Sequence, residues 1–403
     1  MFFRKLKSGL AVTVSFLFLF WANIASADWT LNLTRGVTPT SIKVYNLHML
    51  ILWIVTIIGI GVFSVLFWSV YHHRKSKGAV AEQFHHNTTA EIVWTIIPIL
   101  ILVGLAIPAT KTLIFMEQTG DADMTVKVTG YQWKWKYDYM DEDLSFFSSL
   151  AEDSNKASQL NSGIDPASTD HYLRNVDNPV VLPIKKKIRI LTTSHDVIHA
   201  WWVPALGWKR DAIPGFINDN WTYIEKPGVY RGQCEELCGK GHGYMPIVVK
   251  AVPEDEYKSW VKEMKLAQAQ AAAGADKTWS KDDLIAKGKE VFSTNCSACH
   301  MANGQGLPGA FPPLIDGKEF AASEQMTKPL EERGFWKDGK IVLGPVEHHI
   351  DIVLHGVTGT AMAAFGPQLN DVDIAAVITY ERNSWGNDTG DVVQPSDVKA
   401  ARK

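Results

Sequence analysis

The sequence lacks an excess of charge of either sign. It has 40 lysines and arginines against 43 aspartates and glutamates, which leaves a net charge of −3 over 403 residues. Because proteins that hold nucleic-acid phosphates need a basic surplus, we expect no nucleic-acid partner. The chain is too long for one ordinary domain, and its length predicts two or three. Its hydrophobic fraction of 46% is average, but the apolar residues gather near the N-terminus, which indicates a membrane-embedded part.

Charged residues are almost absent from two long apolar runs in the first third of the chain. The runs cover residues about 47–70 and about 92–113, and each is long enough to cross a hydrocarbon core of about 30 Å. Two such runs in tandem make buried helices of a soluble protein a poor alternative. Between them, Arg74, Lys75 and Lys77 place the connecting loop in the cytoplasm by the positive-inside rule. Everything after about Glu117 is therefore expected outside.

The first 27 residues have the layout of a secretory signal peptide. A basic start is followed by a short apolar stretch and by Ala25-Ser26-Ala27, so cleavage is expected before Asp28. An uncleaved first membrane helix is the alternative, although the apolar stretch is short for a bilayer.

Cysteine is scarce, with four in the whole chain, and an even number in an exported protein suggests disulfides first. For two of them the spacing favours a different interpretation. Cys296, Cys299 and His300 form the C-x-x-C-H pattern of covalent c-type haem attachment, in which both thiols bond the haem and the histidine ligates iron. The flanking helical patterns, SKDDLIAKGKEVFSTNCSACH and DVDIAAVITYERNSWGN, fit a compact haem domain better than a disulfide or a chance match does.

A c-type haem commonly takes a methionine as its sixth iron ligand. Met362 lies on a glycine-bearing loop, GVTGTAMAAFG, and is the predicted ligand. Met301 is too close to His300 to reach the opposite face of a haem, and Met326 lies in a polar stretch. Three histidines compete weakly, since surface or packing roles suit them as well: His348, His349 and His355.

The other two cysteines lie on one short loop with a histidine and a methionine: Cys234, Cys238, His242 and Met245. Thiolate and thioether ligands select soft copper, whereas zinc gains nothing from a methionine. A disulfide between the two cysteines is the alternative, but it leaves the other two side chains unexplained. Short alternating strands surround this loop, and His195 and His199 are expected on a turn upstream of it. These strands predict a small antiparallel β-barrel or sandwich with metal ligands at one end.

Three stretches carry a resemblance to a known family: GYQWKWKYDY, DVIHAWWVPALGWKRDAIPG and GVYRGQCEELCGKGHGYMPIVV. They resemble subunit II of haem-copper cytochrome c oxidases, and the fused haem segment resembles the caa3-type form. The resemblance implies a two-helix transmembrane hairpin, a cupredoxin-like β-barrel or sandwich holding the dinuclear copper A centre, and an all-α class I cytochrome c domain.

The resemblance also implies a ligand set for copper. Cys234 and Cys238 would bridge the two coppers, and His199 and His242 would each cap one. Met245 and the backbone carbonyl of Glu236 would be weaker ligands. The carboxylate of Glu236 would point towards a magnesium or manganese ion at the boundary with subunit I, although a solvated surface acid is the plainer interpretation of that side chain.

For two further residues the resemblance implies a functional role, and each also has a simpler structural interpretation. Trp133 would admit electrons from cytochrome c; the plainer interpretation is a strand that presents one aromatic face. Glu91 would lie at the cytoplasmic mouth of a proton pathway, and the Thr88-to-Glu91 pattern is also a capping box for the second membrane helix. Asp196 resembles a residue that supports the histidine loop, where a turn or capping role is equally plausible.

The expected function is that of an electron-input subunit of an aerobic terminal oxidase, with electrons passing from haem c to copper A and on to subunit I for oxygen reduction coupled to proton translocation. Its oxygen site would lie in subunit I, with haem a and copper B, and its donor would be a soluble or membrane cytochrome c. The alternative is a membrane-tethered electron-transfer or assembly protein outside an oxidase. A nitrous oxide reductase would need a large histidine-rich domain, and none is visible.

The chain is expected in a bacterial plasma membrane as a multi-pass protein, with both cofactor domains outside. Its expected divisions are a signal peptide (1–27), a hairpin (28–118), a copper domain (119–263), a linker (264–279), a haem domain (280–390) and a polar tail (391–403).

Overall fold

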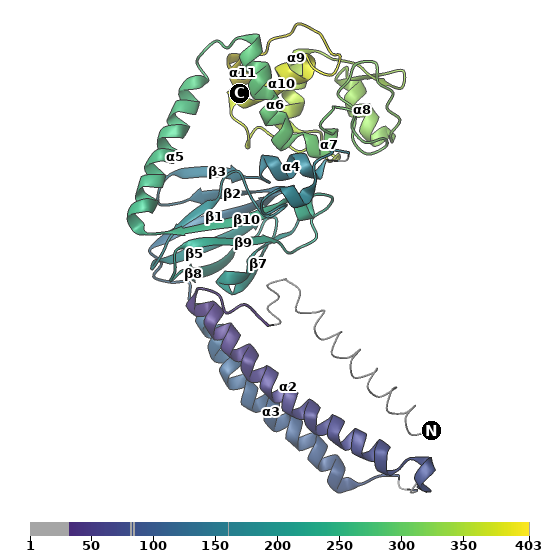
Figure 1. The fold of residues 1–403 in the computed structure, drawn as a ribbon. Helices are drawn as coiled ribbons and strands as arrows, with labels where there is room; N and C mark the ends of the chain where they lie inside the picture. Colours follow the sequence, from purple (N-terminus) through teal and green to yellow (C-terminus); the bar gives the residue numbers. More distant parts are fainter. Residues whose placement is uncertain (1–31, 81–82, 84, 160, 403) are drawn as a thin grey trace, which may run out of the picture.

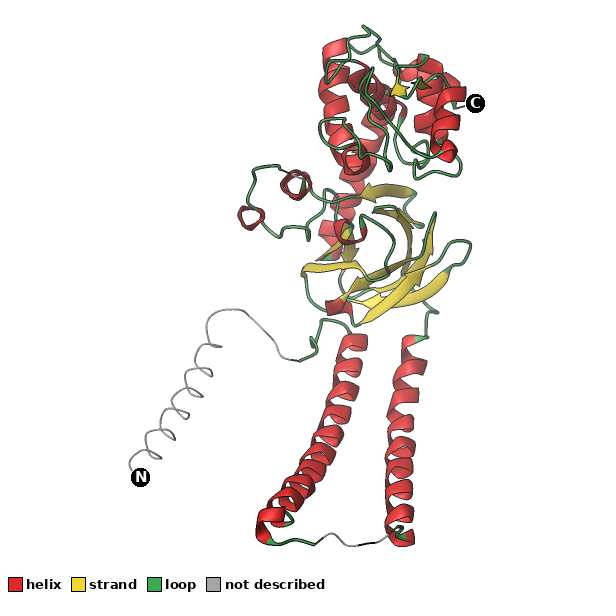
Figure 2. Ribbon diagram, turned by 90° about the vertical axis from the view of Figure 1, so that its right-hand side faces the viewer, coloured by secondary structure: helices red, strands yellow, loops and turns green. Residues whose placement is uncertain are grey.

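The computed structural model describes residues 32–80, 83, 85–159 and 161–402. Three parts follow one another along the molecule: a pair of long helices, a β-sandwich above them, and a helical domain on top (Figures 1 and 2). This is the predicted order of membrane hairpin, copper domain and haem domain. The predicted signal peptide lies outside the described residues.

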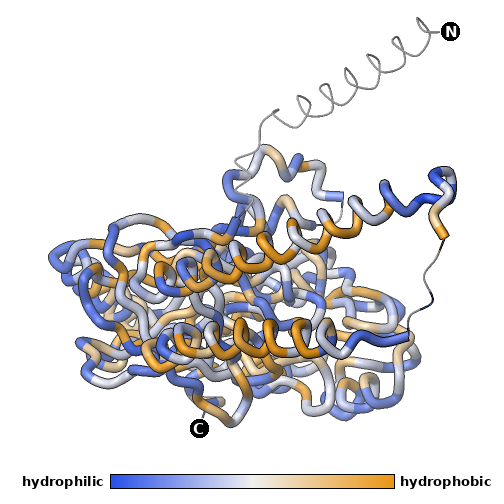
Figure 3. The backbone as a smooth tube through the Cα atoms, turned by 90° about the horizontal axis from the view of Figure 1, so that it is seen from below, coloured by the Kyte–Doolittle hydropathy of each residue, from blue (hydrophilic) through white to orange (hydrophobic). Residues whose placement is uncertain are grey.

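The helical pair consists of α2 (Pro39–His72) and α3 (Thr88–Met116), joined near the short helix η1 (Lys75–Lys77). Both helices are longer than predicted at each end, and by length and composition both could cross a membrane. Hydrophobic residues run along both, and polar residues gather where they are connected (Figure 3). The N-cap of α3 is Asn87, whose side chain accepts the Ala90 N–H, so the helix begins one residue earlier than the predicted capping box.

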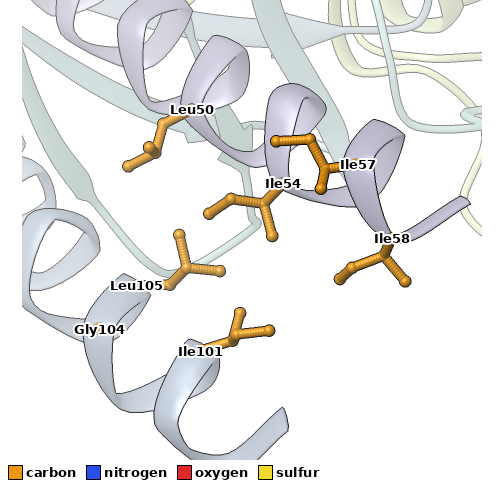
Figure 4. A pocket seen from close by; sticks show the side chains of 7 residues that line it. All are labelled: Leu50, Ile54, Ile57, Ile58, Ile101, Gly104 and Leu105. Atoms are coloured by element: carbon orange, nitrogen blue, oxygen red, sulfur yellow. The ribbon is translucent and has the colours of Figure 1, made fainter. Parts of the chain in front are cut away.

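Between the two helices lies an apolar groove of about 390 Å³ (Figure 4). Isoleucine and leucine side chains from both helices point into it, and Gly104 adds no side chain: it is lined by Leu50, Ile54, Ile57, Ile58, Ile101, Gly104 and Leu105. The helices touch along only part of their length and expose most of their apolar surface. Such a surface is stable only against lipid or other apolar helices.

The β-sandwich has two five-stranded sheets, ordered β3-β2-β1-β5-β8 and β4-β10-β9-β6-β7. Pairing is mostly antiparallel as predicted, but β1 pairs with β5, and β4 with β10, in parallel. Large aromatic and aliphatic side chains fill the space between the sheets, among them Trp135, Trp201 and Ile188. The strands are β1 (Met124–Tyr131), β2 (Lys134–Tyr139), β3 (Leu144–Ser148), β4 (Val180–Pro183), β5 (Lys187–Ser194), β6 (His199–Val203), β7 (Trp208–Ala212), β8 (Asn218–Tyr223), β9 (Gly228–Cys234) and β10 (Pro246–Val252), with the short helices η3 (Pro204–Leu206) and η4 (His242–Tyr244).

The segment from about residue 141 to 178, which lacks sequence periodicity, contains more structure than a loop. It includes β3, the helix α4 (Glu152–Ser158) and the short helix η2 (Pro166–Ser168). The helix α5 (Glu254–Gly274) then runs along the sandwich, with Tyr257 and Val261 in its core. The first turns of α5 therefore belong to the copper domain, and α5 continues through most of the predicted linker.

The C-terminal domain is built on the crossing of α6 (Lys281–Asn295) and α10 (Asp371–Arg382). A Cβ atom at Gly288 would lie 2.1 Å from the Ala376 carbonyl oxygen, so only glycine allows the helices to come this close. Val393 and Val398 are buried in the same core, so the residues predicted as a polar tail take part in the domain. Its other elements are α7 (Ser297–His300), α8 (Glu324–Glu332), β11 (Trp336–Lys337), β12 (Lys340–Ile341), α9 (Val346–His355) and α11 (Pro395–Ala401).

Candidate copper and haem sites

The loop between β9 and β10 brings four soft or borderline ligands together. Cys234 ends β9, and its sulfur lies 3.9 Å from that of Cys238. The Cys238 sulfur is in turn 3.6 Å from Nδ1 of His242 and 3.6 Å from the sulfur of Met245. The backbone oxygen of Glu236 lies 3.4 Å from the Cys234 sulfur. The five residues predicted on this loop therefore meet at one point.

His199 joins this group from β6. It is the first residue of that strand rather than part of a turn, and it is fully buried. Its Nδ1 lies 3.9 Å from the Cys234 sulfur, and its Nε2 lies 2.9 Å from the Asp196 carboxylate. Gly130 makes room for the ring, since a Cβ there would lie 2.7 Å from an imidazole carbon. Asp196 thus orients the ring and leaves Nδ1 facing the sulfurs.

The two cysteine sulfurs contact each other, and their pKa values shift in opposite directions. A hydrogen bond from the Cys238 thiol lowers the pKa of Cys234, and the same bond raises the pKa of Cys238. Both cysteines are free and buried, which argues against the disulfide alternative. The ligand atoms of His199, Cys234 and Cys238 all lie within 4.8 Å of one another. Two thiols, two imidazoles and a thioether in this arrangement fit soft copper ions.

Two tryptophans of the GYQWKWKYDY stretch hold this loop in place. The indole of Trp133 donates to the Cys238 carbonyl at 3.1 Å, and that of Trp135 donates to the Met245 carbonyl at 3.2 Å. The loop approaches Trp133 so closely that a Cβ at Gly241 would lie 2.3 Å from its ring. Gln132, which the sequence did not single out, also donates to the Cys238 carbonyl, at 2.9 Å. The aromatic stretch is therefore in direct contact with the metal loop.

The C-x-x-C-H residues line a cavity of about 760 Å³ between the C-terminal domain and the β-sandwich. That volume is within the range of about 300–1,000 Å³ typical of cofactor sites. Cys296, Cys299, His300 and Met362 all lie on its wall. His300 Nδ1 is 2.9 Å from the Pro312 carbonyl oxygen, so this nitrogen donates and Nε2 keeps its lone pair for a metal. Burial lowers the pKa of His300, which favours the neutral, ligating form.

The structure brings three methionines to this cavity, Met301, Met326 and Met362. Met326, set aside in the sequence for its polar surroundings, reaches the wall because α8 covers the cavity. His349 also lies on the wall, with Nε2 2.9 Å from the Glu381 carboxylate. His348 and His355 have other partners, the Arg333 carbonyl and the Asp351 carboxylate. Met362 stays the predicted sixth ligand.

The two acidic candidates lie in different parts of the molecule, Glu91 in the helical pair and Glu236 in the β-sandwich. Glu91 is in the first turn of α3, where its carboxylate accepts the Asn87 N–H at 3.3 Å. Its capping role is therefore visible. Glu236 is half-buried in the copper loop, and its backbone oxygen is the atom that reaches the cysteine cluster.

Known proteins match each part of this architecture. Residues 26–112 match the family model for the transmembrane domain of cytochrome c oxidase subunit II, and residues 124–252 match the model for its periplasmic domain. Residues 283–380 match cytochrome c oxidase, cbb3-type, subunit III. The probable cytochrome c oxidase subunit 2 of Rickettsia bellii is 38% identical over 234 residues, which are 58% of this chain and 83% of that protein. The chain belongs to the cytochrome c oxidase subunit II family.

Other relatives of this subunit II include the subunit 2 of Cereibacter sphaeroides, 37% identical over 236 residues, which are 57% of this chain and 78% of that one. The crystal structure of the periplasmic domain of subunit II of the Bradyrhizobium japonicum cytochrome oxidase is 40% identical, covers 37% of this chain and 99% of that chain, and has a TM-score of 0.33.

Family membership makes the chain part of an oxidoreductase complex that associates with subunit I and other oxidase subunits in a membrane. The subunit II domain implies copper A, and the cytochrome c domain implies haem c. Two apolar helices and a periplasmic domain fit a bacterial membrane protein. An electron-input role in an oxidase follows from this combination.

Proposed function

We propose that this chain is the electron-input subunit of a caa3-type oxidase, with haem c as the first acceptor and copper A as the second. The observation that carries the proposal is that residues of the copper loop form part of the wall of the haem cavity. The cavity that holds the C-x-x-C-H residues is also lined by Trp133, Gly239 and Gly241, which contact or belong to the copper loop. Both cofactor sites therefore meet at one boundary between two domains of one chain.

Haem c would be attached through Cys296 and Cys299, with His300 and Met362 as iron ligands. The Pro312 carbonyl fixes the His300 ring, and burial keeps the imidazole neutral. A methionine ligand raises the potential of a haem, which suits an acceptor for a cytochrome c donor in the periplasm.

Copper A would be held by Cys234, Cys238, His199, His242 and Met245, with the Glu236 carbonyl as a sixth ligand. When bound, the two metals would supply a site that carries one electron. The chain's contribution is rigidity: four of these residues are buried, and hydrogen bonds from Trp133, Trp135 and Gln132 fix the loop carbonyls. A site that moves little when it gains an electron exchanges electrons quickly.

Beyond this chain, electrons would continue to haem a and copper B of subunit I, where oxygen is reduced to water with proton translocation. We place Glu91 at the cytoplasmic entry of a proton pathway and the Glu236 carboxylate near a magnesium or manganese ion at the subunit I boundary. In this arrangement α2 and α3 cross a bacterial plasma membrane and both cofactor domains lie outside. Trp133 is the proposed entry point of electrons into the copper loop.

The proposal is tested by replacing both bridging cysteines, Cys234→Ser and Cys238→Ser, in the assembled complex. Donor-driven oxygen uptake should be lost, while the haem c absorbance and its reduction by the donor remain. Unchanged uptake would remove the copper role. Purification of the unaltered chain without a many-helix partner carrying haem a would favour the alternative of a tethered electron-transfer or assembly protein.

A further inference from the structure

The segment between β3 and β4 is a closed, anchored insert rather than a loose loop. At its neck, the Ser149 N–H donates to the Asp177 carboxylate at 2.7 Å, and Ala151 N–H donates to the Asn175 carbonyl at 3.0 Å. Inside it, Ser154 of α4 is fully buried, and its hydroxyl accepts the Leu173 N–H at 3.3 Å. We call residues 149–178 the insert.

The insert contacts the haem domain at the end of its attachment helix. The Asn155 amide of α4 donates to the Ser293 carbonyl in the last turn of α6. Figure 1 shows α4 directly below α6 and α7, on top of the sandwich. Five insert residues also line the haem cavity: Ser149, Leu150, Asn155, Ser158 and Gln159. The copper domain therefore supplies part of the haem cavity wall.

A buried lysine makes the second contact. Lys134 opens β2 and is 5% exposed, and its ammonium donates to the Asn295 side-chain oxygen at 2.8 Å. It also lies 5.1 Å from the ring centroids of Phe147 in the sandwich and Phe365 in the haem domain. Burial lowers its pKa to about 8. A lysine is rarely buried without a partner, and here its partners come from both domains.

The copper loop itself makes the third contact. Lys240 lies between Cys238 and His242, and its ammonium donates to the carbonyl of Ala298, which stands between the two haem cysteines. The same ammonium is 4.9 Å from the Phe311 ring centroid. The loop that gathers the copper ligands is thus bonded to the C-x-x-C segment.

All three contacts run in the same direction. In each, a hydrogen-bond donor of the copper domain meets an acceptor of the haem domain, at the C-terminal end of α6 or in α7. The acceptors are the Ser293 and Ala298 carbonyls and the Asn295 side-chain oxygen. The C-terminal end of a helix carries partial negative charge, so cations and amide N–H groups are well suited to it. We propose that Lys134, Asn155 and Lys240 form a docking cradle that fixes the orientation of the chain's own haem domain over Trp133, and that this orientation sets the rate of electron transfer from haem c to the copper loop.

This inference rests on the proposed function and adds a reason for its specificity. Trp133 lines the haem cavity and lies under the haem domain, so a free cytochrome would have to displace that domain to reach it. The tether of α5 keeps the haem domain at high local concentration, and the cradle selects one orientation of it. Lys134 and Asn155 are positioning residues, since they contact the haem domain and not the copper loop.

The test uses the complete oxidase complex. A photoexcited ruthenium complex reduces haem c, which then passes one electron to copper A. Absorbance measures the rate at which haem c is oxidised and copper A is reduced. Lys134→Met and Asn155→Ala should each slow this transfer at least about tenfold, since ~1 Å of misplacement at a reacting centre can cost about 10²-fold. Lys134→Arg should restore most of the rate. The copper A and haem c spectra should stay unchanged.

Two matched substitutions serve as controls. Lys136→Met alters a partly exposed lysine of the same strand, which pairs with Asp138 of that strand. Asn178→Ala alters an asparagine of the insert that donates to the Phe147 carbonyl. Both should transfer electrons at the unaltered rate. Fast transfer in the unaltered complex with no slowing in Lys134→Met or Asn155→Ala would overturn the cradle and leave the proposed function standing. No transfer in the unaltered complex would overturn both.

A measurement on the unaltered protein keeps the inference testable if a variant fails to fold. In the holo complex, an amine-acylating reagent should modify Lys134 far more slowly than Lys209, whose side chain is 45% exposed, as read by mass spectrometry of the digested chain. Acylation of both lysines at similar rates would contradict the docked arrangement, whatever the activity of the enzyme.

Discussion

The copper cluster and the haem cavity are built in different ways. The copper ligands come from one loop and one strand, and three of their donor atoms lie within 4.8 Å of one another. The haem residues come from segments spread between Cys296 and Met362, and the wall of the 760 Å³ cavity is completed by the copper domain. The first site is shaped by the loops and strands of one β-sandwich, whereas the second surrounds a space of cofactor size that two domains enclose. Losing the cofactor should therefore have unequal structural consequences at the two sites.

The largest effect should follow from Cys296→Ala with Cys299→Ala. Without covalent haem, the cavity loses its contents and the α8 and α9 side chains that line it lose their packing partner. We expect no c-type absorbance and no cooperative thermal transition for the haem domain, measured by calorimetry on the full chain. The sandwich transition should persist. Two normal transitions without haem would show that the cavity is as self-supporting as the copper cluster.

The copper cluster is the counterpart of that experiment. Removing copper with a chelator should lower the free energy of unfolding of the sandwich only by the stabilisation that a bound ligand supplies. That stabilisation is about 2.7 kcal/mol when the free copper concentration is 100 times the Kd. The near-ultraviolet circular dichroism of the buried tryptophans should be unchanged. Loss of that signal on chelation would mean that copper, and not the sheet, organises the loop.

Met362→Ala sharpens the comparison within the haem site. Loss of the sixth ligand should lower the haem potential and let an external ligand such as imidazole bind the iron, both followed by visible spectroscopy. Met326→Ala, on the same cavity wall, is the matched control and should leave the potential and the iron coordination unchanged. The reverse pattern would assign the ligand to α8.

Asp196→Asn is expected to act on copper alone. The carboxylate lies 2.9 Å from His199 Nε2 and fixes the ring, and loss of such support typically weakens metal binding about 10- to 100-fold. Competition with a chelator of known affinity measures the change. An unaltered affinity would mean that the packing of Gly130 against the ring is sufficient.

The smallest effect should come from the contact between Trp133 and the copper loop. Gly241→Ala places a methyl group against the indole ring and should cost about 1–3 kcal/mol in sandwich stability, as overpacking does. Gly243→Ala, where a Cβ meets no atom within 4 Å, is the control. Equal stabilities in denaturant unfolding would show that Trp133 moves freely.

The two sites also differ in how far the sequence predicts them. Cys234, Cys238, His242 and Met245 lie within one loop, so their spacing alone indicates a soft metal. His199 reaches the site through strand pairing between β6 and β9. The strand pattern offered both His195 and His199 as candidates, and the family resemblance selected His199. The haem motif is equally visible, but Met326 reaches the cavity through the placement of α8, which no local pattern reveals.

The cradle could not be predicted from the sequence. Lys134 reads as one polar residue in an alternating strand, and Asn155 belongs to a short polar helix, EDSNKAS, without apolar periodicity. Their partners, Asn295 and Ser293, lie in a different domain. Such contacts between distant segments are set by how whole domains pack, and local propensity carries no information about them.

The central claim is that one chain holds a dinuclear copper centre beside a covalent haem. Electron paramagnetic resonance and visible spectroscopy of the purified full-length subunit in its complex test it most directly. The account predicts a mixed-valence signal from one unpaired electron shared by two coppers, together with a low-spin c-type haem spectrum. A single-copper signal, zinc in the cysteine loop, or a disulfide between Cys234 and Cys238 would contradict it.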